Sequence, residues 1–339
     1  MQKILVTGTA GFIGFHLAKL LLEQGHLVLG IDAITDSYDT ALKRRRHGIL
    51  LQNPNFTAHE TDICDYPALK QVADGFQPDV IVHLAAQAGV RYSLENPRAY
   101  IETNVNGTFN VMEIARELAV DHLLIASTSS VYGANEEMPF SESQKTETQM
   151  SLYAATKKAG ENMGHTYAHL WGLPTTMFRF FTVYGPWGRP DMALFKFTQL
   201  GLEGAPIDVF NHGNMERDFT YVGDIVRAIS LLIKAPPPKV LERADWKDIE
   251  GDSLSHVAPF RVINIGNSEK VRLMDYIEAI ENAIGRKIER NYMDIQPGDV
   301  PASWADCQLL QNLVDYQPRT SVQDGVNKFV DWYRDYYGV

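Results

Sequence analysis

The fold is decided by one glycine-rich stretch near the start of the chain, Gly8-Thr9-Ala10-Gly11-Phe12-Ile13-Gly14. It lies between a short apolar run, residues 3–7, and a segment, residues 12–24, whose apolar residues repeat with the period of a helix. Glycines at such a strand-to-helix turn let the backbone bend sharply and approach a pyrophosphate, which then lies on the helix N-terminus. The spacing departs from the Gly-x-Gly-x-x-Gly of the usual dinucleotide turn, so a glycine turn without a ligand stays open as an alternative.

A carboxylate at the end of the next predicted strand favours the ligand. The apolar run over residues 27–31 ends at Asp32. A carboxylate at this place accepts hydrogen bonds from the adenosine ribose hydroxyls and repels a 2′-phosphate, although Asp32 alone also suits the start of a turn. The two features together predict a site for NAD rather than NADP, with these contacts: Gly8, Gly11, Phe12, Ile13, Gly14 and Asp32.

Strands and helices alternate through the first half of the chain. Further short apolar runs lie at residues 79–84 and 122–126, a later one lies at 175–180, and helical stretches such as 104–117 separate them. This alternation is typical of an α/β fold with a doubly wound parallel sheet. We expect residues 1–185 to form a Rossmann-type NAD-binding domain. Parts of its sheet are expected to close near 175–182 and again around 220–235 and 262–266.

The pattern loosens after about Gly185, where prolines and glycines punctuate short elements. We expect residues 186–339 to form mostly a smaller, mixed α/β substrate lobe that is interleaved with the first domain. The segment 235–259 begins with three consecutive prolines after Ala235 and has little periodicity. A long surface loop is the prediction for this segment.

Composition narrows the class of partner. The formal net charge of −11 argues against a nucleic-acid footprint, because phosphate binding normally needs a basic surface. The only cysteines, Cys64 and Cys307, are far apart, so neither a disulfide framework nor a metal site is expected. The apolar run at the N-terminus is too short for a secretory signal or a membrane span. A cytoplasmic protein without membrane contact is therefore the default expectation.

Two segments carry the residue types of acid–base chemistry. Tyr153 and Lys157 stand four residues apart, hence on one helix face, and an ammonium there stabilises a phenolate and lowers its pKa. A phenol tuned in this way removes a proton from a hydroxyl near neutral pH. Thr128, Ser129 and Ser130 follow a buried strand, and hydroxyls at the carboxyl end of such a strand face the ligand crevice. Each pattern alone is also common in turns and helices without any catalytic role.

The glycine turn, the Ser-Thr segment and the Tyr153/Lys157 pair, in this order, resemble the extended short-chain dehydrogenase/reductase family. Further matching pieces run through nearly the whole chain and are similar to its branch that modifies nucleotide sugars. The resemblance implies Thr128 as the catalytic hydroxyl, Tyr153 as the base and Lys157 as a ligand of the cofactor ribose. It also implies NAD contacts at Asp62, Ile63, Leu84, Ala85, Ala86, Gln87 and Asn104.

Within this branch, the stretches around Arg91 and from Arg179 to Met192 are most similar to the UDP-glucuronate 4-epimerases. These enzymes invert C4 of UDP-glucuronate through a transient 4-keto uronate, giving UDP-galacturonate. Short hydroxyls at Thr128, Ser129, Ser130 and Thr182 suit the sugar carboxylate, and Arg189 adds charge unless it is a solvated surface residue. The remaining expected UDP contacts are Arg217 and Arg91 for the diphosphate, Phe210 for uracil and Asp299 for its ribose.

Neighbouring activities remain as alternatives. Related 4,6-dehydratases carry an Asp-Glu pair where Ser129 and Ser130 stand, and UDP-glucuronate decarboxylases usually have glutamate at the position of Ser130. UDP-glucose 4-epimerases usually have asparagine at the position of Thr182. The residues favour the uronate, but a decarboxylase, a UDP-glucose 4-epimerase and, less readily, a non-enzymatic NAD-binding protein stay open. Family members are commonly homodimers, through a bundle that includes the helix of Tyr153.

Overall fold

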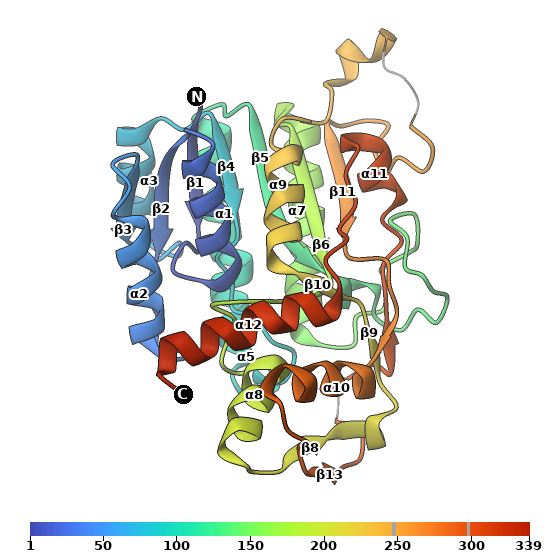
Figure 1. The fold of residues 1–339 in the computed structure, drawn as a ribbon. Coiled ribbons are helices and arrows are strands. Elements are labelled where there is room, and N and C mark those ends of the chain that lie inside the picture. Colours follow the sequence, from blue (N-terminus) through green and yellow to red (C-terminus); the bar gives the residue numbers. More distant parts are fainter. Residues whose placement is uncertain (246–248, 297–298) are drawn as a thin grey trace.

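The computed structural model describes residues 1–245, 249–296 and 299–339. A seven-stranded parallel sheet, of order β11-β6-β5-β4-β1-β2-β3, forms its centre (Figure 1). The strands are β1 (Lys3–Thr7), β2 (Leu27–Asp32), β3 (Phe56–Glu60), β4 (Val80–His83), β5 (His122–Thr128), β6 (Thr175–Phe180) and β11 (Phe260–Ile265). The order 3-2-1-4-5-6 is that of a doubly wound dinucleotide-binding sheet, which β11 extends at one edge. The predicted fold class is confirmed.

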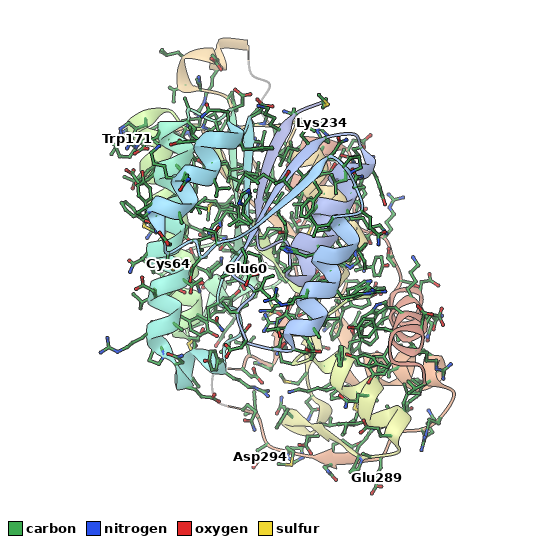
Figure 2. All side chains as sticks on the ribbon, turned by 90° about the vertical axis from the view of Figure 1, so that its left-hand side faces the viewer. Glu60, Cys64, Trp171, Lys234, Glu289 and Asp294 are labelled. Carbon is green, nitrogen blue, oxygen red and sulfur yellow. The ribbon has the colours of Figure 1, made fainter. Side chains whose placement is uncertain are left out.

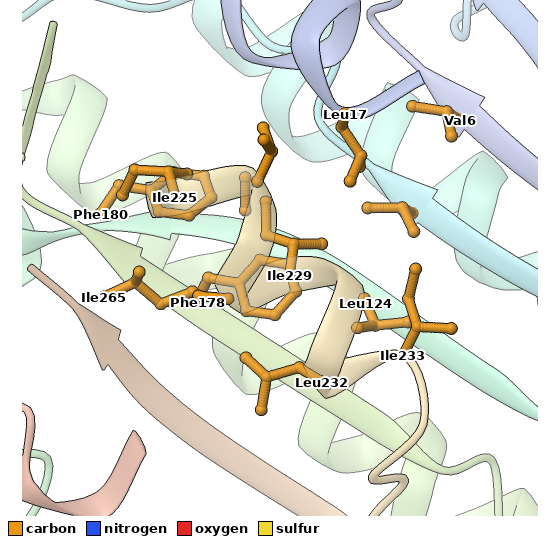
Figure 3. Packing of buried hydrophobic residues seen from close by; sticks show 14 of the residues in the cluster. Val6, Leu17, Leu124, Phe178, Phe180, Ile225, Ile229, Leu232, Ile233 and Ile265 are labelled. Atoms are coloured by element: carbon orange, nitrogen blue, oxygen red, sulfur yellow. The ribbon is translucent and has the colours of Figure 1, made fainter. Parts of the chain in front are cut away.

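Helices cover both faces of this sheet. One face carries α1 (Phe12–Glu23), α2 (Thr40–Leu50), α9 (Val222–Leu232) and α11 (Gln308–Val314), and the other carries α3 (Tyr66–Phe76), α6 (Thr108–Glu117) and α7 (Leu152–Trp171). On the first face, Leu124 of β5 packs in one cluster with Ile229 of α9 (Figure 3). Its neighbour Leu123 joins the opposite cluster with Met112 of α6. Because both faces are covered, this strand is apolar along its length.

The start of α7 is fixed by a side-chain cap. Ser151 has extended backbone angles, and its hydroxyl accepts a hydrogen bond of 3.1 Å from the Ala154 N–H. This cap satisfies one of the free N–H groups of the first helical turn. At the other end Gly172 adopts the left-handed conformation that closes the helix. The cap therefore determines where Tyr153, in the first turn, meets the sheet.

A smaller C-terminal lobe lies below the sheet in Figure 1 and has its own apolar core. It contains α8 (Ala193–Glu203), α10 (Leu273–Ile284), α12 (Val322–Tyr337), β8 (Ile207–Val209) and β13 (Arg290–Tyr292). Figure 2 shows Glu289 and Asp294 at its tip, far from Lys234 at the other end of the molecule. Small sheets link the two parts: β7 (Thr182–Tyr184) with β10 (Phe219–Tyr221), and β9 (Glu216–Arg217) with β12 (Val271–Arg272) and β14 (Ala302–Ser303).

Short helical pieces complete the chain. They are α4 (Tyr92–Glu95), α5 (Pro97–Tyr100), the π-helical η1 (Ile101–Gly107), and the 3-10 turns η2 (Ser129–Tyr132), η3 (Phe210–Gly213) and η4 (Val240–Asp245). The expected helix over 104–117 thus starts as a π-helix and becomes α-helical only at Thr108. Within the three described ranges, none of the helices combines the length and the apolar character that a membrane crossing needs.

The expectation that residues 220–235 join the sheet is wrong. This segment returns to the first domain, but as helix α9, which packs against α1. Its buried residues Ile225, Ile229 and Leu232 recur at helical spacing, which places them on one face toward the sheet. The strand near 175–182 is also shorter than expected, because β6 ends at Phe180. Thr182 begins β7, which pairs with β10 outside the central sheet.

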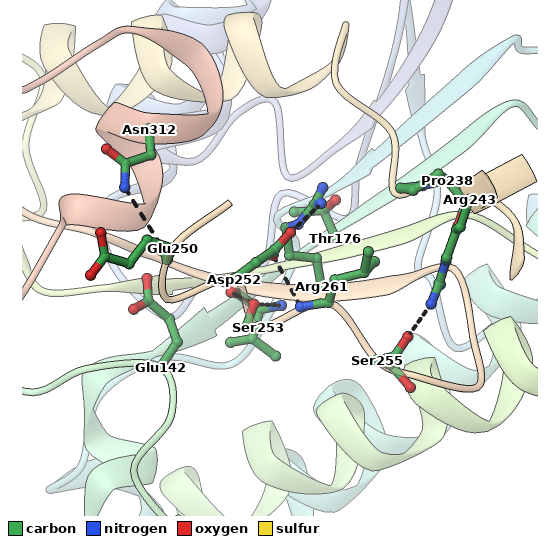
Figure 4. A network of polar contacts seen from close by, with 12 residues as sticks. Glu142, Thr176, Pro238, Arg243, Glu250, Asp252, Ser253, Ser255, Arg261 and Asn312 are labelled. Carbon is green, nitrogen blue, oxygen red and sulfur yellow. Dashed lines mark hydrogen bonds and ion pairs between the residues drawn. The ribbon is translucent and has the colours of Figure 1, made fainter. Parts of the chain in front are cut away.

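The segment 235–259 is more structured than a plain surface loop. Arg243 of η4 donates hydrogen bonds of 2.6 Å to the carbonyls of Ser255 and Ala258, which folds the segment on itself (Figure 4). Asp252 binds the buried guanidinium of Arg261, on β11, with both oxygens at 2.8 and 2.9 Å. The segment is therefore tied to the edge strand. Residues 246–248 lie outside the described part of this prediction.

Candidate active site

The carboxyl ends of the central strands open into a cavity of about 690 Å³, a volume that suits a small-molecule site. It is bounded by the turn after β1, the segment after β4 and the first turns of α7. Every predicted cofactor residue except Asn104 lines this cavity: Gly8, Gly11, Phe12, Ile13, Gly14, Asp32, Asp62, Ile63, Leu84, Ala85, Ala86, Gln87, Tyr153 and Lys157. The fold thus brings together residues that are far apart in the sequence.

The glycine turn leaves no room for side chains. A Cβ atom at Gly14 would lie 2.1 Å from the Gly8 carbonyl oxygen, and one at Gly11 would lie 2.9 Å from the same atom. Gly8 itself has φ +80°, and a Cβ there would meet the Ala85 nitrogen at 2.9 Å. The residue before helix α1 is Gly11, so no side chain caps the N–H groups of the first turn. The residues of this turn line the cavity. This close, uncapped turn fits the pyrophosphate of a dinucleotide.

Asp32 is held in place by the backbone around it. Its oxygens accept hydrogen bonds from the Ala10 N–H at 2.9 Å and the Ile34 N–H at 2.8 Å, and the residue lines the cavity. Lys43 lines the same wall and donates to the Thr35 carbonyl at 2.6 Å. Burial lowers the pKa of Lys43, while the charge of Asp32 acts in the opposite direction. At the end of the cavity predicted to hold the adenosine, the Asp32 carboxylate is therefore fixed by backbone hydrogen bonds, and Lys43 lies on the same wall.

Asn104 is not among the residues that line the cavity, and its predicted contact with the cofactor stays a prediction. Its amide oxygen accepts from the Gln87 N–H at 2.8 Å, and its amide nitrogen donates to the Gln87 carbonyl at 2.9 Å and to Thr156 at 3.1 Å. Asn104 lies in the π-helical turn, behind the cavity wall. It holds Gln87, which does line the cavity.

Thr128, Tyr153 and Lys157 meet at one end of the cavity. Thr128 is the last residue of β5, and its hydroxyl lies close enough to the Tyr153 phenol to lower the pKa of that phenol. The ring of Tyr100 stands edge-on to that of Tyr153, with 6.0 Å between the ring centres. Lys157 is buried one helical turn further along α7. The three predicted catalytic residues thus share one site.

The electrostatics of these groups differ in one respect from the prediction. Burial raises the pKa of Tyr153, and the Thr128 hydroxyl and the Arg189 charge oppose this rise. The charge that opposes the rise is that of Arg189, whereas the prediction named Lys157. Burial lowers the pKa of Lys157 to about 8, against the raising effect of the Glu161 charge. Arg189 is therefore the cation whose charge favours the phenolate form of Tyr153.

Of the residues predicted for the sugar carboxylate, two line cavities of the site and two directly follow Thr128. Thr182 and Arg189 line a small adjoining cavity of about 30 Å³, and Arg189 also lines the large one. Only 25% of the Arg189 side chain is exposed, and it binds Asp191 through Nε at 3.0 Å and Nη2 at 2.6 Å. Arg189 is therefore no solvated surface residue. Ser129 and Ser130 begin η2 directly after Thr128, and the Ser130 N–H donates to the Thr128 hydroxyl at 3.2 Å.

Three of the predicted nucleotide contacts meet one another. The guanidinium of Arg91 lies over the ring of Phe210, 4.7 Å from its centre, and its Nη2 binds Asp299 at 2.9 Å. The contact joins the segment after β4 to the C-terminal lobe. Arg217 instead donates to the Val300 carbonyl at 2.7 Å. Arg217 is thus held by backbone carbonyl groups.

Sequence reasoning missed several residues of the cavity wall. Ser127, Phe180 and Asp191 line it, and none was singled out. Ser127 and Phe180 lie at the carboxyl ends of neighbouring strands, a position that marks the ligand side of such a sheet. That signal was present in the sequence. For Asp191, the only signal in the sequence was its position two residues after Arg189.

Known proteins and solved structures are similar to this chain over nearly its whole length. CapI of Staphylococcus aureus is 55% identical over 99% of both chains. A probable UDP-glucuronate 4-epimerase from Rhizobium meliloti (strain 1021) is 51% identical over 99% of this chain and 98% of its own. The crystal structure of UDP-glucuronic acid 4-epimerase from Bacillus cereus, in complex with UDP-glucuronic acid and NAD, matches with a TM-score of 0.87 at 32% identity, covering 99% of this chain and 100% of the other.

The family match extends over most of the site. Residues 4–242 match the NAD dependent epimerase/dehydratase family. This range contains the glycine turn, Asp32 and the cluster of Thr128, Tyr153 and Lys157. The chain therefore belongs to the NAD dependent epimerase/dehydratase family.

Proposed function

We propose that this protein is a UDP-glucuronate 4-epimerase that uses NAD to convert UDP-glucuronate into UDP-galacturonate. The observation that carries the proposal is that Tyr153 and Lys157 line the glycine-lined cavity together, with Thr128 beside Tyr153. Relatives of that name, 51% identical in sequence and 32% identical in a solved structure, support it. Identification of the product formed from UDP-glucuronate tests it.

The cofactor roles follow from the cavity wall. We propose that the glycine turn holds the pyrophosphate, Asp32 the adenosine ribose, and Asp62 and Ile63 the adenine. Ala85 and Ala86 line the phosphates and ribose, and Lys157 holds the nicotinamide ribose. The fit supports a division in which residues 1–185, with later returning segments, bind NAD and the lobe binds the sugar nucleotide.

Tyr153 acts as the base for the C4 hydroxyl in this proposal. Its phenolate takes the hydroxyl proton, and Thr128, whose hydroxyl lies beside the phenol, orients both groups. When bound, NAD supplies a reversible acceptor for the hydride at C4. Tyr153 returns the proton to the C4 oxygen after the 4-keto uronate has turned its other face. The Arg189 charge favours the phenolate in both steps.

The nucleotide half is assigned to the lobe and the segment after β4. Arg91 and Arg217 are the diphosphate ligands, Phe210 stacks on uracil and Asp299 accepts from its ribose. Arg91 already lies over Phe210 and on Asp299, so the nucleotide must share or replace these contacts. In such an exchange the diphosphate takes the place of the Asp299 carboxylate at Arg91, and Asp299 accepts a hydrogen bond from the ribose instead.

The carboxylate contacts matter because a 4-keto uronate is a β-keto acid and loses carbon dioxide readily. Hydrogen bonds that pin the carboxylate in the sugar plane oppose this loss, since decarboxylation needs the C–C bond aligned with the carbonyl π system. We assign this task to Thr182, Ser129, Ser130 and Arg189. The same residues separate the proposal from a 4,6-dehydratase, because serine hydroxyls do not replace an acid–base pair.

Replacing Thr182 by alanine is expected to raise the share of pentose among the products several-fold. The change removes one carboxylate hydrogen bond and leaves Tyr153 in place. NMR of the products made from UDP-glucuronate measures the ratio. Thr57→Ala, at an exposed position of the edge strand β3, is the matched control. An unchanged ratio in Thr182→Ala and Ser129→Ala would count against the pinning role.

We also propose a homodimer formed through α6 and α7. Large apolar side chains are exposed there: Phe109 to 45%, Leu170 to 59% and Trp171 to 50% (Figure 2 shows Trp171 on the outside). Two copies packed through these helices would cover this patch as a four-helix bundle. A cytoplasmic location is proposed as well, in keeping with the free thiols of Cys64 and Cys307.

Analytical ultracentrifugation is expected to give twice the mass of one chain. The double variant Phe109→Arg/Trp171→Arg is expected to sediment as a monomer, because it places charges in the apolar contact. Leu51→Arg is the control, since Leu51 is 57% exposed after α2, on the opposite face of the sheet. A monomeric wild type, or a dimer that survives the double variant, would refute this arrangement.

A further inference from the structure

A buried carboxylate lies directly behind the catalytic residues. Glu161, on α7, accepts a hydrogen bond of 2.7 Å from the Ser127 hydroxyl. It also binds Arg179 with both oxygens, through Nε and Nη2 at 2.9 Å each, and Lys158 at 3.1 Å. The Glu161 and Arg179 side chains are only 2% and 3% exposed. Three elements, β5, β6 and α7, thus meet at one charged pair.

The position of this pair links it to each catalytic residue. Ser127 precedes Thr128 on β5 and is in register with Arg179 on β6. Glu161 follows Lys157 by one turn of α7, so both side chains point to the same side of the helix. Ser127 and Lys157 also line the cavity. The ion pair therefore sits under the floor of the active site rather than in a remote part of the core.

A buried ion pair is a costly way to join three elements. Removing two charges from water is unfavourable, and well-packed apolar residues often stabilise a fold as well or better. Arg179 adds to this cost, because its Nη1 has no hydrogen-bond partner within the described part of the chain. Its guanidinium lies instead over the Tyr132 ring, 4.8 Å from the centre. Fold stability alone is a weak reason for this arrangement.

We propose that Glu161 is a positioning residue of the active site. With Arg179 it holds the helix turn of Lys157 against the strand end of Thr128, and it places a negative charge one turn from the Lys157 ammonium. The inference rests on the proposed role of Lys157 in NAD binding and catalysis. The groups that face the pair are Lys158 on α7, Ser127 on β5 and Tyr132 above Arg179. His83 on β4 faces Lys157. Burial, together with the Lys157 charge, lowers the pKa of that imidazole to about 3, so His83 is neutral.

The charge at Glu161 makes a signed prediction. Burial lowers the pKa of Lys157 to about 8, and the Glu161 charge raises it against this effect. Removing the negative charge lowers the pKa further, so the ammonium is lost at a lower pH. Removing the Arg179 charge leaves the Glu161 charge less compensated and acts in the opposite direction. A purely structural pair would instead give losses without opposite shifts.

The test compares Glu161→Gln, Arg179→Met and the double variant between about pH 6.5 and pH 10. Two quantities are measured at each pH: kcat/KM for epimerisation and the dissociation constant of NAD by titration calorimetry. In Glu161→Gln the alkaline limb of both profiles is expected to shift down by about one pH unit. In Arg179→Met it is expected to shift up, and in the double variant to return toward wild type.

The matched control is Asp252→Asn, which breaks a second buried ion pair, with Arg261, at the sheet edge away from the cavity (Figure 4). It is expected to lower the melting temperature and leave both pH profiles unchanged. Glu161→Asp keeps the charge and is expected to keep the wild-type limb with a lower kcat. If Glu161→Gln does not fold, the inference is tested by whether the alkaline limb of the Arg179→Met profiles shifts to higher pH.

Shifts of the same sign in Glu161→Gln and Arg179→Met, or no shift in Arg179→Met, would overturn the inference. A wild type that binds NAD but does not epimerise UDP-glucuronate would refute the proposed function instead. In that case the pH dependence of the NAD dissociation constant still reports whether Lys157 is protonated. The two failures are therefore distinguishable.

Discussion

Tyr153→Phe is expected to lower turnover about a thousandfold or more while NAD stays bound. The variant loses only the hydroxyl that takes the C4 proton and keeps the ring that packs against Tyr100. Lys157 and the glycine turn, the proposed holders of NAD, are untouched. The measurements are product formation from UDP-glucuronate and the amount of NAD released on denaturing the purified protein.

Tyr66→Phe is the control for this variant, because Tyr66 binds Glu117 at 2.9 Å outside the cavity and its loss should leave turnover at the wild-type rate. Tyr153→Phe that still epimerises would remove Tyr153 from the role of base. A Tyr153→Phe protein without NAD would show that the phenol holds the cofactor rather than the substrate proton.

Gly14→Ala is expected to abolish NAD binding. The added Cβ would lie 2.1 Å from the Gly8 carbonyl oxygen, a backbone atom that moves only if the turn opens. Overpacking of this kind costs about 1–3 kcal/mol and separates the glycine turn from the start of α1. The variant is expected to be purified without NAD, and its melting temperature is expected not to rise when NAD is added.

Gly48→Ala is the matched control, because a Cβ at this position in α2 meets nothing within 4 Å. Alanine is the better helix former, so the control is expected to keep NAD and to gain up to about 1 kcal/mol of stability. A Gly14→Ala protein that binds NAD as tightly as the wild type would contradict the assignment of the turn.

Much of the fold was readable because its signals are local. The alternation of apolar strands with helices, the glycine turn and the end of β2 at Asp32 each depend on a few neighbouring residues. The carboxyl ends of parallel strands meet at one edge, so strand ends alone predicted that Asp32 and Thr128 face the ligand crevice, whereas Ala85 was implied by the family resemblance. Tyr153 and Lys157 needed only helical spacing.

What the sequence did not reveal depends on contacts between distant segments. Segment 220–235 was misplaced because an apolar run of that length suits either a strand or a helix beside the sheet. The contact of Arg91 with Asp299 joins segments far apart in the chain, and no local pattern announces it. Asn104 was assigned to the cofactor by resemblance, whereas its amide is committed to Gln87. The buried pair of Glu161 and Arg179 was missed for the same reason.

The most direct test of the account is NMR of the products formed when the purified protein is incubated with UDP-glucuronate. The account predicts UDP-galacturonate as the main product, with only a trace of pentose and no net consumption of NAD. A UDP-pentose as the main product would make the protein a decarboxylase. Unchanged UDP-glucuronate, with NAD bound, would contradict the central claim that this site inverts C4 of a uronate.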